Sequence, residues 1–393
     1  MKSVSETSKA APRTSTDRTQ SRDPSADQVD AIALVDRIVD DAIGRQASDV
    51  HFEPTAAGVE VRLRVDGLLE VHSHHESAVG RMLVTRLMVM AHLLTYRLDI
   101  PQEGRLTIDS HNDGVLLELR LAIMPTTHGL RAAVRMPAEL IQPRSLENLN
   151  LPPKVLAGLK QFAAADSGML LVTGPAGSGK TTTIYALIEH IARTCQGLSI
   201  VSLEDPVERD IPGVTQIEVS PFGQLTYERA LRSILRQDPQ VLMLGEIRDA
   251  ATASLAAQAA LSGHRLVCTL HASTPGGAIA RLLEMGLEPY RITSALWGAM
   301  AQRLLRRLDD PAATGSSRYR GRIPAAELVR ISAPLRAAIL ARADSEELER
   351  VAGLEPGYST LRESAHTLLV QQLTDDAEVE RVLGPAGIPG ERA

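Results

Sequence analysis

The sequence predicts an α/β fold in which a smaller α+β domain precedes a parallel sheet covered by helices, with a helical region at the C-terminal end. Four short apolar runs alternate with helix-forming stretches in the second part of the chain, which is typical of parallel strands joined by crossover helices. In the first part, residues 59–65 alternate apolar and polar side chains, which indicates a half-buried strand, and Asp66-Gly67 predicts the turn that closes it. The chain has 393 residues, enough for both domains and a large core.

Composition disfavours several classes of protein. The formal net charge of -6 and the absence of a basic stripe disfavour a nucleic-acid partner. The two cysteines, Cys195 and Cys268, lie in apolar settings and are expected to be small buried hydrophobes rather than metal ligands. Because the chain has neither an 18-residue apolar run nor the apolar core of a signal peptide, we expect a cytoplasmic protein that reaches membranes only through partners.

The most specific pattern is a phosphate-binding loop in its required setting. Residues 169–172 read as a buried strand, residues 174–181 match G-x-x-x-x-G-K-[ST], and residues 182–192 have helical apolar spacing. Lys180 is expected to neutralise the β- and γ-phosphates of a nucleoside triphosphate, and the Thr181 hydroxyl to bind Mg²⁺. The residues expected to bind the nucleotide are Gly174, Pro175, Ala176, Gly177, Ser178, Gly179, Lys180, Thr181 and Thr182.

Acidic residues follow two other apolar runs, at the strand ends where parallel sheets place their ligands. Glu204 follows residues 198–203 and is a candidate to orient or deprotonate the attacking water, with Glu208 as the alternative base. Glu246 follows residues 241–244 and is expected to hold Mg²⁺ through water. On residue type alone, such acids are more often strand-end caps than catalytic groups.

Two histidines flank a further apolar run at residues 266–270. His264 lies at its start and His271 at its end, and both are expected to sense the γ-phosphate or to position water. Together the four runs and the helices between them predict a doubly wound, RecA-like parallel sheet.

These patterns divide the chain into four parts: a polar disordered tail at 1–28, the α+β domain at 29–136, a linker at 137–153, and the phosphate-loop domain at 154–393. In the α+β domain, Arg105, Arg120 and Arg135 lie on or beside strands. Exposed strand arginines are usually only solvated, but some of these could reach a γ-phosphate from the neighbouring domain.

The last part of the chain is expected to be helical. The helices are predicted at residues 289–308, 332–343 and 361–369, with a flexible interruption at 309–317 before a turn at 319–322 and a frayed end at 384–393.

From residue 29 to about residue 383, the sequence resembles the type II/type IV secretion ATPases, specifically the assembly-type branch. The resemblance depends on an ordered series of motifs and not on the phosphate loop alone. They are residues 47–54 (ASDVHFEP), 62–67 (RLRVDG), 101–105 (PQEGR), 204–208 (EDPVE), 231–239 (LRSILRQDP), 245–249 (GEIRD), 263–271 (GHRLVCTLH), 302–304 (QRL) and 319–322 (YRGR).

The resemblance implies a homohexameric ATPase with ATP between its two domains. By matching motif, it implies that Glu204 is the general base, that Glu246 is the metal-side acid, and that both histidines sense the γ-phosphate. It implies that the three arginines approach the nucleotide. It also implies that domain closure acts on an inner-membrane platform protein so that pilin subunits enter a secretion pseudopilus or a type IV pilus, which places the motor in the cytoplasm at the inner membrane.

The sequence departs from this family in three places. Relatives often hold zinc on four cysteines after the Gln-Arg-Leu motif, but residues 308–322 contain no cysteine, so no zinc is predicted. Many relatives also carry a further N-terminal domain for recruitment, where this chain has a polar tail. Leu130 stands where relatives usually have glutamate.

Three alternatives remain open at this stage. A retraction motor would use the same active site, although residues 51–54 and 101–105 favour assembly. A nucleotide-binding scaffold that no longer hydrolyses ATP is suggested by the missing zinc module and recruitment domain. A DNA translocase should bind DNA in a salt-sensitive way, which the acidic chain gives no reason to expect.

Overall fold

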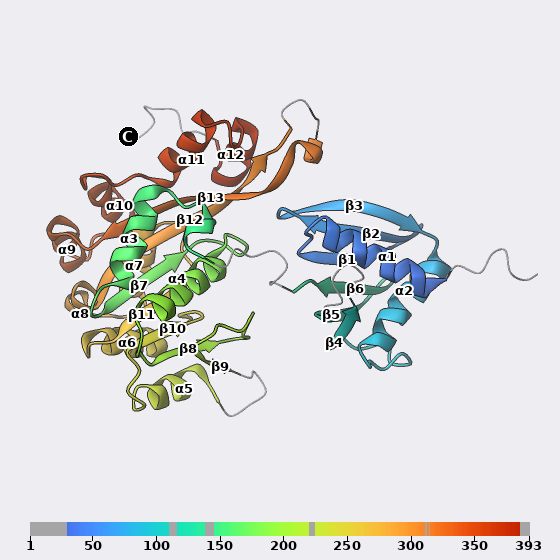
Figure 1. The fold of residues 1–393 in the computed structure, drawn as a ribbon, viewed down its shortest axis with the longest axis horizontal. Helices are drawn as coiled ribbons and strands as arrows, with labels where there is room; N and C mark the ends of the chain where they lie inside the picture. Colours follow the sequence, from blue (N-terminus) through green and yellow to red (C-terminus); the bar gives the residue numbers. More distant parts are fainter. Residues whose placement is uncertain are drawn as a thin grey trace, which may run out of the picture.

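The structure is a computed structural model of the chain, and it describes residues 30–109, 116–137, 145–219, 225–310, 313 and 315–385. The expected tail at 1–28 lies outside these residues, as do residues 138–144 of the expected linker and 386–393 of the expected frayed end. Figure 1 shows two bodies side by side, each built around its own sheet. The domain boundaries expected from the sequence stay predictions.

The first sheet is antiparallel, with strand order β3-β2-β1-β6-β5-β4. Its strands are β1 (Asp49–Thr55), β2 (Gly58–Val65), β3 (Leu68–His75), β4 (Gln102–Asp109), β5 (Leu116–Thr126) and β6 (Gly129–Arg135). Helices α1 (Ala31–Gly44) and α2 (Ser77–Met90) contribute to the same apolar core. The predicted turn is confirmed, because Asp66 and Gly67 both have positive φ between β2 and β3.

Alternation along each strand gives this sheet one apolar face and one polar face. In β5, Leu117, Leu119, Leu121 and Ile123 are buried, whereas the residues between them are more exposed. Helix α1 begins where the Asp30 side chain accepts hydrogen bonds from two backbone N–H groups, and it buries one stripe at helical spacing. The helices therefore cover the apolar face and leave the polar face free.

The second sheet has strand order β13-β12-β7-β11-β10-β8-β9, and all of its strands are parallel except the edge strand β13. Its strands are β7 (Gly168–Thr173), β8 (Ile200–Glu204), β9 (Thr215–Glu218), β10 (Val241–Leu244), β11 (Arg265–Leu270), β12 (Leu296–Leu308) and β13 (Tyr319–Arg330). Helix α3 (Pro153–Ala163) precedes the first of these strands, and the helices between them are α4 (Lys180–Thr194), α5 (Tyr227–Ile234), α6 (Ala250–Leu261), α7 (Pro275–Glu284) and α8 (Pro289–Ala295).

Helices cover both faces of the second sheet. Met169 and Leu171 of β7 belong to one apolar cluster, with residues of α5, α6 and α7. Leu170 and Val172 belong to the other, with residues of α3 and α4. The predicted doubly wound α/β fold is therefore confirmed.

The prediction of a single helix at residues 289–308 is wrong. Only α8 is helical, and Leu296–Leu308 form β12, which pairs with β7 on one side and with β13 on the other. The apolar run was ambiguous because a strand buried on both faces lacks the alternation that would separate it from a buried helix. The turn expected at 319–322 is instead the start of β13.

Four helices end the described chain, so the region beyond β13 is helical as expected. They are α9 (Ala333–Leu340), α10 (Ser345–Gly353), α11 (Leu361–Val370) and α12 (Asp376–Leu383). Helix α12 and the end of β12 are joined by ion pairs from Glu378 to Arg306. Among the described residues, none of the helices combines the length and the apolar character needed to span a bilayer.

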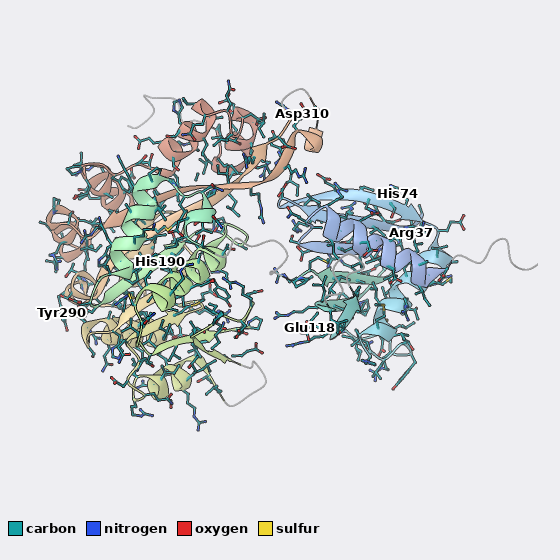
Figure 2. All side chains as sticks on the ribbon, viewed as in Figure 1. Arg37, His74, Glu118, His190, Tyr290 and Asp310 are labelled. Atoms are coloured by element: carbon teal, nitrogen blue, oxygen red, sulfur yellow. The ribbon has the colours of Figure 1, made fainter. Side chains whose placement is uncertain are left out.

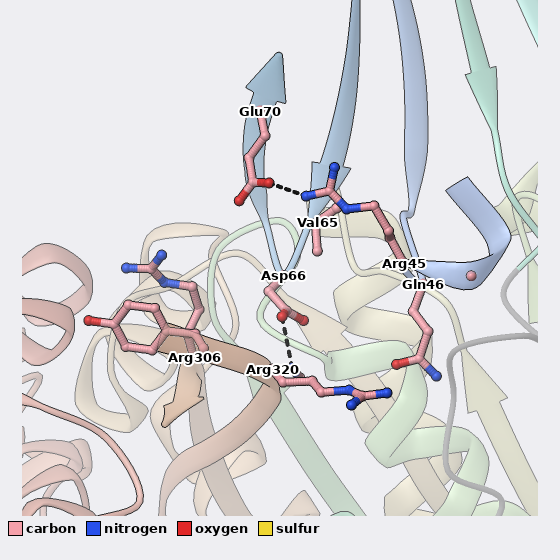
Figure 3. A pocket seen from close by; sticks show the side chains of 10 residues that line it. Arg45, Gln46, Val65, Asp66, Glu70, Arg306 and Arg320 are labelled. Atoms are coloured by element: carbon pink, nitrogen blue, oxygen red, sulfur yellow. Dashed lines mark hydrogen bonds and ion pairs between the residues drawn. The ribbon is translucent and has the colours of Figure 1, made fainter. Parts of the chain in front are cut away.

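The two bodies meet at the β2–β3 turn and at the acidic segment after β8. The Gly321 backbone N–H donates to the Asp66 carboxylate at 2.8 Å, and an Arg120 nitrogen lies 3.5 Å from the Val207 carbonyl oxygen. Figure 3 shows the first contact at a polar cavity of about 300 Å³ that is also lined by Arg45, Glu70 and Arg306. The lining residues of this cavity do not include the phosphate loop.

Candidate functional site

The loop between β7 and α4 has the backbone that phosphate binding requires. Gly174, Gly177 and Gly179 have φ angles of 145°, 75° and 86°, in the region that favours glycine. A Cβ on Gly174 would lie 2.6 Å from the Gln302 carbonyl oxygen, and one on Gly179 would lie 2.7 Å from the Gln302 side-chain nitrogen. These two glycines are therefore required both by their φ angles and by the close approach of β12.

Lys180 begins α4, and its ammonium group lies over the loop. It donates to the carbonyl oxygens of Gly174 at 2.8 Å and Pro175 at 2.9 Å. Burial lowers the pKa of Lys180, whereas the nearby Glu246 carboxylate raises it. The Ser178 hydroxyl in the same loop is buried without a hydrogen-bond partner. An ammonium group, an unpaired hydroxyl and the start of a helix fit a phosphate group.

Glu204 ends β8 and is 3% exposed. Its carboxylate accepts hydrogen bonds from the Tyr185 hydroxyl, from the Ser202 hydroxyl at 2.5 Å and from the Gln216 amide at 3.1 Å. Burial raises the pKa of Tyr185, so this phenol donates in its neutral form. The three donors are all neutral, and among the described residues no cation forms an ion pair with Glu204.

The alternative base, Glu208, lies in a different environment. Glu208 is exposed. It joins the hydrogen bonds around Glu204 only through its backbone N–H, which donates to the Tyr185 oxygen at 3.0 Å. Glu204 is therefore buried and oriented by its donors whereas the Glu208 side chain is exposed, and the assignment of the proton acceptor stays a prediction.

Glu246 follows β10 and faces groups from two neighbouring segments. His271, directly after β11, lies 2.6 Å from one carboxylate oxygen, and Arg248 donates to the other at 2.7 Å. Arg248 also bonds to Asp205 at 3.1 Å, so it links the acidic segment after β8 to the one after β10. The structure therefore brings Lys180, Glu246 and His271 to one edge of the sheet.

His264 lies at the opposite edge. Its ring bonds to the Ala259 carbonyl oxygen at 2.8 Å, and its own carbonyl oxygen accepts from the Gly168 N–H at the start of β7. The strand from Arg265 to Leu270 separates it from the phosphate loop by about 20 Å, at about 3.3 Å per residue. The structure therefore does not place His264 beside the phosphate loop of the same chain, and its role as a γ-phosphate sensor stays a prediction.

The three arginines of the first sheet form one row. Arg105 is opposite Arg120, and Arg120 is opposite Arg135, on the adjacent strands β4, β5 and β6. Directly opposite residues share a face, so all three lie on the polar face. Arg105 pairs with Glu118, which Figure 2 shows on the side of this domain that faces the larger one. Arg120 makes the contact with the larger domain, at Val207.

Sequence patterns missed three residues of this site as functional candidates. Tyr185 orients Glu204, Arg248 bonds to Glu246, and Gln302 packs against the loop. Arg248 and Gln302 stood in recognised motifs, at residues 245–249 and 302–304, but neither motif suggested a role for them. Among the described residues, no group of three or more histidine, cysteine or acidic side chains could hold a metal ion. Thr181 and Glu246 stay predicted as Mg²⁺ ligands, and the absence of zinc stays a prediction.

A glycine loop between a parallel strand and a helix, with acidic residues at the ends of β8 and β10 in the same sheet, defines a phosphate-loop protein of the α/β class. Residues 25–381 match the family model described as "Type II/IV secretion system protein". The chain belongs to this family.

Curated relatives agree with the assignment. The chain is 34% identical over 387 residues to the type IV pilus assembly ATPase PilB of Thermus thermophilus, covering 90% of this chain and 43% of that protein. It is 39% identical over 284 residues to the type II secretion system ATPase E of Vibrio cholerae, covering 72% of this chain and 56% of that protein. The chain thus spans about half the length of these two relatives.

Solved structures show the same fold. The pilus retraction motor PilT with bound ADP matches with a TM-score of 0.62 and 26% identity, covering 91% of this chain and 99% of that one. The ATPase DotB of Legionella pneumophila matches with a TM-score of 0.71 and 20% identity, covering 89% of this chain and 95% of that one.

Proposed function

We propose that this protein is an ATPase motor that hydrolyses ATP to ADP and phosphate and drives the assembly of a type II secretion pseudopilus or a type IV pilus. The observation that carries the proposal is the convergence of Lys180, Glu246 and His271 beside the phosphate loop. The relatives named as ATPases of pilus assembly and type II secretion support the system.

Each part of the site has a proposed role. The loop from Gly174 to Thr182 binds the phosphates, with Lys180 next to the β- and γ-phosphates and the N-terminal end of α4 directed at them. Thr181 and, through water, Glu246 would hold Mg²⁺, which would supply positive charge to the phosphate oxygens. Glu204 accepts a proton from the attacking water, and its neutral donors keep the carboxylate oriented as it does so.

His271 is the proposed sensor of the γ-phosphate. Its ring already contacts the Glu246 carboxylate, so loss of the terminal phosphate changes the charge next to both side chains. The row of Arg105, Arg120 and Arg135 is the proposed counterpart from the first domain, since Arg120 already lies near the segment that follows Glu204. Domain closure over ATP and opening after hydrolysis then produce the stroke.

We propose that six copies form a ring, that the ring acts on a membrane platform protein, and that it reaches the inner membrane from the cytoplasm only through such partners. The resemblance to the secretion ATPases supports this assembly, and the described residues include no membrane-spanning helix. A second candidate is a retraction motor, favoured by the likeness to PilT over nearly the whole of that chain. Gene neighbours that encode pilins and a polytopic platform protein would identify the system.

The test is phosphate release by the purified protein with Mg²⁺ and ATP. Lys180→Ala should abolish release, because the substitution removes the only ammonium group seen at the described loop. Equal release by the wild type and Lys180→Ala would contradict the motor. Binding of nucleotide by the wild type without any turnover would favour a nucleotide-binding scaffold.

A further inference from the structure

Gln302 is a buried polar residue with two hydrogen bonds to the nucleotide loop region. It lies on β12, one residue after Ala301, which pairs with Thr173 at the end of β7. Gln302 is 2% exposed. Its amide nitrogen donates to the Ser178 carbonyl oxygen at 2.9 Å, and its amide oxygen accepts from the Thr183 hydroxyl at 2.8 Å.

These contacts fix the loop at both of its ends. The backbone oxygen of Gln302 lies against Gly174 at the start of the loop, and its amide nitrogen lies against Gly179 at the end. The Ser178 carbonyl oxygen can only accept, so it assigns the amide N–H₂ to that side and leaves the amide oxygen to accept from the Thr183 hydroxyl. Gln302 is therefore held in one orientation by α4 while it holds the loop.

The bond to Ser178 sets the direction of a peptide group. In a planar trans peptide, the N–H of Gly179 points away from the carbonyl oxygen of Ser178. Because Gln302 holds this carbonyl oxygen on the β12 side, the Gly179 N–H is directed to the other side of the loop. A loop binds phosphate only when its N–H groups point to a common place.

We propose that Gln302 is a positioning residue for the nucleotide, acting through the Ser178–Gly179 peptide and not by contact with the phosphates. This inference rests on the proposed ATPase function. Loss of the Gln302 amide frees this peptide to rotate, which weakens nucleotide binding more than it slows the chemical step. A purely structural role would lower thermal stability and leave nucleotide affinity unchanged.

The test compares Gln302→Met with Ser364→Ala. Methionine has a similar length but cannot hydrogen-bond to Ser178 or Thr183. Ser364 accepts a hydrogen bond from the N–H of Ala326, which is opposite Gln302 on β13, so Ser364→Ala removes a buried bond from the same hairpin without touching the loop. The measurements are the melting temperature, the dissociation constant of a fluorescent ADP analogue, and KM and kcat for ATP.

Gln302→Met should weaken analogue binding and raise KM by about tenfold, with a smaller change in kcat. A tenfold loss of affinity is what a lost hydrogen bond and a buried unpaired carbonyl together are expected to cause. Ser364→Ala should lower the melting temperature and leave both binding values at the wild-type level. If Gln302→Met does not fold, Gln302→Glu replaces it, because glutamate keeps the bond from Thr183 and presents an acceptor to Ser178.

The outcomes separate the inference from the function on which it rests. A folded Gln302 variant that binds the analogue as tightly as the wild type overturns the positioning role alone. A wild-type protein that binds no analogue overturns the proposed function, and the positioning role with it.

Discussion

The carboxyl edge of the parallel sheet and the loop end of the β12–β13 hairpin each bury a glutamate, but they surround it with different donors. Glu204 at the edge accepts from a phenol, a hydroxyl and an amide, all of them neutral. Glu378 at the hairpin is fully buried and accepts from Arg306 and Arg381. Both carboxylates are oriented, but only the second has its charge compensated by cations.

This difference fits the catalytic role proposed for Glu204 and a structural role for Glu378. Burial alone would raise the pKa of Glu378, but hydrogen bonds from Arg381 and Arg306 hold it below its ordinary value of 4.5. A carboxylate paired in this way resists protonation. Neutral donors leave the charge of Glu204 without an ion partner, so this group can take a proton without breaking an ion pair.

The largest expected effect is on turnover, at Glu204. Glu204→Gln keeps the shape, and its amide can still bond to Tyr185, Ser202 and Gln216. Phosphate release should fall by about 10²- to 10⁴-fold, the usual loss on removing a general base, while the melting temperature stays near that of the wild type. Glu208→Gln is the control, because this exposed side chain should change the rate little. Similar losses in both variants would contradict the assignment.

The next effect is on stability, at Glu378. Glu378→Gln leaves Arg306 facing a neutral group in a buried site, and the free energy of unfolding should fall by about 3 kcal/mol. Denaturant titration followed by circular dichroism measures the change. Phosphate release per folded molecule should stay close to the wild-type value, and a loss as large as that of Glu204→Gln would contradict the distinction.

The same pair predicts the pH dependence of stability. Because the pKa of Glu378 is lower in the folded state than in the unfolded state, its contribution is fully present above about pH 4.5 and is lost as the pH falls through the folded-state pKa. The stability of the wild type should therefore drop more steeply than that of Glu378→Gln below this pH. Parallel curves would show that Glu378 does not contribute in this way.

The smallest expected effect distinguishes the two ends of β11. His271→Asn should lower kcat/KM by about ten- to a hundredfold, the value of a hydrogen bond to a charged group. His264→Asn should leave kcat/KM unchanged, because the His264 ring contacts the Ala259 carbonyl oxygen at the opposite edge of the sheet. Steady-state kinetics of the two variants measure the difference. Equal losses would place His264 in the site, for instance through a neighbouring subunit.

Local sequence was sufficient to predict the structure wherever a few adjacent residues determine the backbone conformation. The phosphate loop, the Asp66-Gly67 turn and the doubly wound order of strands and helices follow from glycine freedom and apolar periodicity alone. Glu204, Glu246 and His271 could be expected at one edge of the sheet because each lies at or just after the end of a strand, and parallel strands end at one edge.

Only the tertiary structure decided the rest, because it depends on residues far apart in the chain. Residues 296–308 form a strand since β7 and β13 supply the hydrogen bonds of a ladder, which no local periodicity reveals. The row of arginines depends on the register of the three strands β4, β5 and β6. The position of His264 at the edge opposite the phosphate loop depends on the direction of β11. Gln302 reaches Ser178 across 124 positions of sequence, so its contact exists only once β12 has packed beside β7.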